Sequence, residues 1–137
     1  MHTTYNQRQI WLLALIAINI FAAVWHYADH IIFFDDYPEP SWLIPQITDS
    51  LWLVMTPLSI AGYYQYLKKA FLSAYCCLYI YIIMSQITLG QYIITPMWHL
   101  SLKMNTLILL ESITAIPLLI FVAWSQLFLK ESTVNSQ

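Results

Sequence analysis

Long apolar stretches, separated by very few charged residues, constrain this chain more than any other feature of its sequence. Hydrophobic residues make up 60% of its 137 positions, whereas Asp, Glu, Lys and Arg together make up 9%. Soluble domains carry about 25% charged residues. We therefore predict an integral membrane protein that has the lipid bilayer as its surroundings.

The same composition excludes several other classes of protein. A net charge of −2 and a high apolar content do not fit a disordered chain. The five Lys and Arg residues are scattered, so they do not form the basic patch of a nucleic-acid-binding protein. Cys76 and Cys77 are adjacent, which suits neither a disulfide-stapled secreted domain nor a C-x-x-C redox motif. Because the chain lacks a basic patch, we expect no nucleic-acid partner.

Four of the apolar stretches are long enough to be membrane helices. About 20 helical residues cross the hydrocarbon core of a bilayer, because a helix rises by about 1.5 Å per residue. The stretches predict helices over residues 9–34, 47–67, 70–95 and 104–129. The short connection between the second and third favours antiparallel neighbours. We predict one all-α domain over residues 1–137, an integral membrane four-helix bundle.

The basic residues predict the orientation of this bundle. Arg8, Lys68, Lys69 and Lys130 fall on one side of a four-span topology, and only Lys103 falls on the other. Lys and Arg are enriched on the cytoplasmic side, so we expect both termini in the cytoplasm and the protein in the cell (inner) membrane. A cleaved signal peptide is the alternative interpretation of the N-terminus, but the first apolar run is longer than such peptides carry.

Four ionisable residues interrupt the predicted membrane helices: His26, Asp29, His30 and Glu111. The first three follow the pattern H-x-x-D-H, which places them on one stripe of a helix. Helix rise puts His26 and Glu111 each about 12 Å from the outer end of the bundle, so they meet if the first and fourth helices pack together. Ionisable residues at such depth are costly and mark functional sites.

A metal site is one interpretation of this pattern. Two histidines at i and i+4 are the spacing that chelates a metal from one helix face. His26 and His30 would supply two ligands, and His99 with Glu111 or Asp29 would complete the set. Nitrogen and oxygen donors suit a divalent transition metal such as Zn or Fe.

A polar network or a ligand pocket is the other interpretation. Buried ionisable groups in membranes commonly pair with one another. Asn19 lies two turns deeper than His26 on the same stripe, and Gln91 lies near the outer end of the third helix. Together with Glu111, these two residues are candidates for the lining of a pocket.

Two classes of function remain open. The first is an outward-opening polar site that binds a metal, a lipid or another small molecule, with catalysis left open. The second is an accessory or structural subunit of a membrane complex, or a homo-oligomer, with no chemistry of its own. In that case the acidic first loop, with Tyr37 and Trp42, would dock a membrane protein partner.

Two segments, residues 26–30 and 36–42, carry a resemblance to known proteins. Their patterns, H-x-x-D-[HN] and Y-P-E-P-x-W, resemble those of a family of small uncharacterised bacterial four-span membrane proteins. That resemblance implies a four-span topology and no particular activity. The chain is also similar in size and span number to the sterol isomerase and sigma-2 receptor superfamily, which binds sterols or amines in a membrane pocket. Because the spacing of acidic and histidine residues differs here, this second resemblance implies only a common fold.

Overall fold

The computed structural model describes residues 2–37, 40–42 and 44–128. All regular structure in these residues is helical, which confirms the predicted all-α class. The four long helices are α1 (His2–Ile32), α2 (Pro45–Leu67), α3 (Phe71–Ile87) and α5 (Leu102–Phe128). The short elements are η1 (Phe34–Asp36), η2 (Thr88–Gly90), α4 (Gln91–Ile94) and η3 (Met97–His99).

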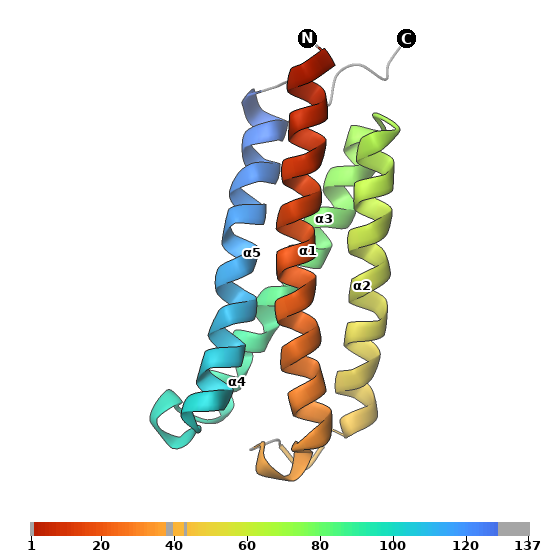
Figure 1. Cartoon of the computed structure of the whole chain (residues 1–137). Coiled ribbons are helices and arrows are strands. Elements are labelled where there is room, and N and C mark those ends of the chain that lie inside the picture. The colour runs from red at the N-terminus through yellow and green to blue at the C-terminus, as the bar shows by residue number, and fades with distance from the viewer. Residues whose placement is uncertain (1, 38–39, 43, 129–137) are drawn as a thin grey trace.

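Each of the four long helices packs against two of the others (Figure 1). α1 contacts α2 and α5, and α3 contacts the same two helices from the other side. The start of α1, the end of α5 and the α2–α3 connection lie together at what we call the Lys69 end. The α1–α2 and α4–α5 connections lie at the opposite end, which we call the Tyr37 end. This order brings α5, the last helix, directly against α1.

The third predicted helix is interrupted. It was expected to run unbroken over residues 70–95, but α3 ends at Ile87, and η2 and α4 continue the chain to Ile94. Gly90, the last residue of η2, is a poor helix former. The backbone angles at Ile87, Thr88 and Gly90 stay in the helical region, so the segment tightens without reversing direction.

Three segments of the described chain are long and apolar enough to cross a membrane: Thr4–Ile32, Phe71–Ile94 and Leu102–Phe128. They support the predicted membrane protein. α2 has 23 residues, which is long enough, but its Ser, Thr, Gln and Tyr residues make it less apolar. A membrane crossing by α2 therefore stays a prediction at this point.

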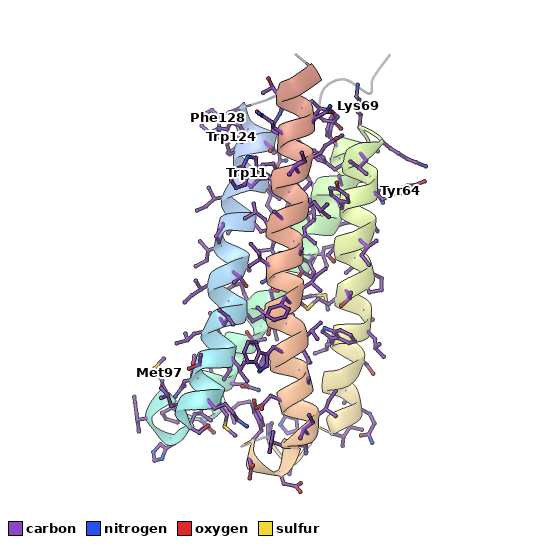
Figure 2. All side chains as sticks on the ribbon, viewed as in Figure 1. Trp11, Tyr64, Lys69, Met97, Trp124 and Phe128 are labelled. Atoms are coloured by element: carbon purple, nitrogen blue, oxygen red, sulfur yellow. The ribbon has the colours of Figure 1, made fainter. Side chains whose placement is uncertain are left out.

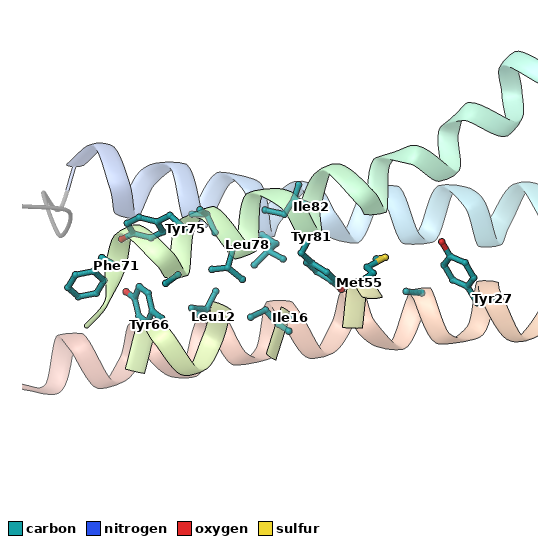
Figure 3. Close-up of a cluster of buried hydrophobic side chains, with 14 residues drawn as sticks. Leu12, Ile16, Tyr27, Met55, Tyr66, Phe71, Tyr75, Leu78, Tyr81 and Ile82 are labelled. Atoms are coloured by element: carbon teal, nitrogen blue, oxygen red, sulfur yellow. The ribbon is translucent and has the colours of Figure 1, made fainter. Parts of the chain in front are cut away.

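A hydrophobic core fills the space between the long helices (Figure 3). Its side chains come from all four, and they include Leu12, Ile16, Met55, Tyr66, Leu78, Tyr81 and Leu118. α2 and α3 pack closely at Gly62, where a Cβ atom would lie 2.8 Å from Cγ of Leu78. Small residues allow such close approach between membrane helices, whose association depends on packing.

Candidate functional site

A buried pair of ionisable side chains joins α1 to α5. Nδ1 of His26 lies 2.6 Å from Oε2 of Glu111, and both side chains are almost completely inaccessible to solvent. The two residues stand at equal depth on neighbouring helices, as helix rise predicts. The predicted meeting of His26 and Glu111 is therefore confirmed.

A second set of polar groups holds this pair from the side nearer the Lys69 end. The side-chain amide of Asn19 donates to the main-chain carbonyl of Glu111 at 2.9 Å and to Oγ1 of Thr114 at 2.8 Å. Oγ of Ser85 donates to Oδ1 of Asn19 at 3.0 Å. Asn19 thus ties α1 to α3 and α5. Its contact with the main chain of Glu111 supports the pair, and a place for Asn19 in the lining of a ligand pocket stays a prediction.

His30 lies one turn closer to the Tyr37 end and is also buried. Its ring centroid is 6.5 Å from that of His26 and 4.6 Å from that of Tyr37. The two histidines therefore share a helix face, as their spacing predicts. Tyr37 was not singled out as part of the site, because it belongs to a loop whose path no periodicity fixes.

Asp29 has partners of its own. Oδ2 of Asp29 accepts a hydrogen bond from the Tyr37 hydroxyl at 2.9 Å, and Oδ1 lies 2.9 Å from Nζ of Lys103. Asp29 thus joins the end of α1 to the first loop and to the start of α5. Tyr37 is only 5% exposed, whereas Trp42 is 73% exposed, and docking of a partner protein through this loop stays a prediction. The sequence also predicts that Pro38, Glu39 and Pro40 form a rigid cap over the end of α1, and of these Pro38 and Glu39 lie outside the described residues.

The five predicted metal ligands do not gather into one cluster. His99 is exposed in η3 and lines a separate depression of about 750 Å³ with Asp36 and Lys103. Among the described residues, no group of three or more His, Cys, Asp or Glu side chains is arranged to hold a metal ion. The two predicted carboxylate ligands have other partners, because Asp29 is paired with Lys103 and Glu111 is paired with His26. Binding of Zn or Fe stays a prediction that no ligand set in these residues supports.

A cavity of about 370 Å³ lies beside the pair, between α1, α2 and the α3–α4 segment. Small-molecule sites have volumes of about 300–1,000 Å³ and mostly apolar walls with a few polar groups. This wall is mostly apolar too, and it includes His26, His30, Trp42, Ile87, Gly90 and Gln91. Gln91 is part of this wall, and Glu111 contacts His26, which is also part of it. Binding of a ligand by Gln91 and Glu111 stays a prediction. Trp42 and Gly90 were missed because neither residue is ionisable.

Only one of the two ring nitrogens of His26 has a hydrogen-bond partner in the described chain. Nδ1 is committed to Glu111, while Nε2 is buried and has no hydrogen-bond partner within the described chain. Buried polar atoms of this kind are rare and call for an explanation. Because His26 also lines the cavity, its ring is the part of the pair that lies at the cavity wall.

Comparison with known proteins assigns no family to these features. The chain matches no protein-family model, and no curated protein or solved structure is significantly similar to it. The resemblances carried by residues 26–30 and 36–42 therefore do not establish membership of a family.

Proposed function

We propose that this chain is an integral membrane four-helix bundle that binds a small molecule at an outward-opening site centred on His26 and Glu111. One observation carries the proposal: a buried histidine, paired with a buried carboxyl group, lines a mostly apolar cavity and keeps one ring nitrogen that has no hydrogen-bond partner in the described part of the chain. Both termini lie in the cytoplasm in this proposal.

The exposed surface of α2 supports its place as the fourth membrane helix. Its side chains Leu53, Val54 and Ile60 are all more than half exposed, although each is large and apolar. Such a surface is stable in lipid and unfavourable in water. Because α2 packs against both α1 and α3, it shares their surroundings.

The distribution of aromatic and basic side chains supports the orientation. Figure 2 shows Trp11, Tyr64, Trp124 and Phe128 around the Lys69 end, where Trp and Tyr typically meet the membrane interface. Lys69 at this end indicates the cytoplasmic side. Lys103, the one basic residue predicted outside, is paired with Asp29, so its charge is compensated locally.

Energetics support a binding role over a purely structural one. An ionisable residue in the middle of a membrane helix costs at least about 2.5–3.5 kcal/mol on insertion scales. The hydrogen bonds of Asn19 already join α1 to α5 without any charge. A structural role therefore does not require His26 and Glu111, whereas a polar group at a mostly apolar cavity gives a bound ligand its orientation.

Accessibility of the cavity wall from the two sides of the membrane tests the proposal. In a Cys76→Ser/Cys77→Ser background, Gln91→Cys should react with a small membrane-impermeant thiol reagent added from the outside. The matched control is Ser73→Cys, at an exposed position near the Lys69 end of α3, which should react only from the cytoplasm. The reverse pattern, or protection of Gln91→Cys from both sides, would contradict an outward-opening site.

A further inference from the structure

The hydrogen bond between His26 and Glu111 determines which chemical group faces the cavity. The pair has three arrangements of its protons: neutral imidazole with carboxylate, imidazolium with carboxylate, and neutral imidazole with carboxylic acid. The first leaves a buried negative charge on Glu111 without compensation, because its ion-pair partner in the described chain, His26, is neutral in that arrangement. An uncompensated charge in such surroundings is strongly disfavoured.

Both remaining arrangements place a proton on Nε2. In imidazolium, both ring nitrogens carry one. With a carboxylic acid at Glu111, Nδ1 either accepts from the acid hydroxyl or donates to an oxygen of the acid. Oε1 of Glu111 has no hydrogen-bond partner among the described residues, so the second choice leaves the acid hydroxyl buried without an acceptor. The first choice is therefore favoured, and it puts the single imidazole proton on Nε2. His26 therefore offers a hydrogen-bond donor, not an acceptor, to whatever occupies the cavity.

The wall of the cavity limits the charge of its ligand. Among the described residues that form it, there is no Lys, Arg, Asp or Glu, and most of the surface is apolar. Leu51, Ile87 and Ile94 supply aliphatic surface, and Trp42 supplies an aromatic ring. A charged head group would be desolvated here without a counter-ion, which is unfavourable. A neutral, largely apolar molecule loses little on entry.

From these observations we infer that the cavity binds a neutral apolar molecule with an acceptor oxygen at one end, such as a ketone, an ester or an alcohol, which accepts a hydrogen bond from Nε2 of His26. This inference rests on the proposed function and names the class of ligand that its site takes.

Gly90 provides a way to close the cavity without disturbing the pair. It lines the cavity, its backbone angles are helical (φ −59°), and a Cβ atom built there meets nothing within 4 Å. A large side chain is thus compatible with the backbone. In Gly90→Phe, the ring should occupy the free volume and exclude the ligand while the His26–Glu111 hydrogen bond remains.

Photolabelling of the full chain in lipid nanodiscs tests the ligand class. The probe is a medium-chain methyl ketone that carries a diazirine, and the control probe has a methylene group in place of the carbonyl. The ketone should label the cavity wall at residues such as Leu51 and Ile87, about tenfold more efficiently than the control. That factor corresponds to one hydrogen bond of about 1.4 kcal/mol. Gly90→Phe should abolish labelling of these residues by both probes.

The double variant His26→Phe/Glu111→Leu removes the donor and leaves no polar group unpaired, so it avoids the instability that either single change would cause. It should bring ketone labelling down to the level of the control probe. Equal labelling by both probes in the unmodified chain, or ketone labelling that survives Gly90→Phe, would overturn the inference. If Gln91→Cys nevertheless reacts from the outside, the proposed function stands and only the ligand class is wrong.

Discussion

At the scale of single residues, the stability of the buried pair depends on both members being present. Removing one partner of a buried ion pair leaves the other uncompensated and costs about 3–5 kcal/mol. We therefore expect His26→Ala to destabilise the protein by about 3 kcal/mol, measured as the free energy of unfolding in detergent. His26→Phe/Glu111→Leu should cost clearly less than the sum of the two single changes, and additive effects would contradict the coupling of the pair.

The contacts of Asp29 with Tyr37 and Lys103 should contribute less to stability than the His26–Glu111 pair does, because they lie closer to solvent. Lys103 is about half exposed, and exposed ion pairs contribute about 0–1 kcal/mol. Tyr37→Phe removes a buried hydrogen bond and should destabilise the protein by about 1 kcal/mol. Lys103→Met should have a smaller effect. Asp36→Asn, at an exposed neighbouring position, is the control and should change nothing measurable; a Tyr37→Phe protein as stable as this control would refute the role of the hydrogen bond.

The two residue clusters differ in how far the sequence predicts them. The His26–Glu111 contact follows from helix rise and from the high energy of exposing either residue to lipid, so spacing alone predicts it. The partners of Asp29 depend on the paths of two loops, which hydrophobic periodicity does not determine. His99 shows the same limit, because a position in a loop near the predicted site does not bring its side chain into that site.

At the scale of helices, the two glycines have opposite roles. In Gly62→Ala, the new Cβ atom would lie 2.8 Å from Cγ of the fully buried Leu78, so either the Leu78 side chain or the two helices must shift. Overpacking of this kind costs about 1–3 kcal/mol. Gly90→Ala meets no atom and should instead stabilise its helical segment by about 0.5–1 kcal/mol. Thermal denaturation of both variants checks the contrast, and a stable Gly62→Ala protein would contradict close α2–α3 packing.

The α2–α3 connection stores a small backbone strain at Lys69. Its φ angle is +61°, a left-handed conformation that disfavours any residue with a Cβ atom by about 1–2 kcal/mol. Hydrogen bonds from Lys69 N–H to Tyr66 O and from Ala70 N–H to Gln65 O form a Schellman cap there. Lys69→Gly should therefore be more stable than Lys69→Ala by about 1 kcal/mol. Both variants lose the lysine side chain, so equal melting temperatures would contradict the strain.

At the scale of the whole molecule, the helical class and the number of long helices could be predicted, whereas the cavity could not. A bilayer demands long apolar helices, so composition and run length determine the first two. The cavity depends on how the helices diverge. In Figure 1, α3 crosses obliquely behind α1, so α4 and the start of α2 appear on opposite sides of α1 at the Tyr37 end. The cavity wall comes from these diverging segments, and no pattern within one helix predicts that divergence.

The most direct test of the account is the protonation of His26 itself. Nitrogen NMR of histidine-labelled protein in nanodiscs, with the His26 signals assigned by their absence from the His26→Phe/Glu111→Leu variant, reports whether each ring nitrogen carries a proton. The account predicts a protonated Nε2, and its resonance should shift when the medium-chain methyl ketone is added but not when the matching hydrocarbon is added. An Nε2 without a proton, or a resonance that neither compound shifts, would contradict a donor at the cavity and the binding site built on it.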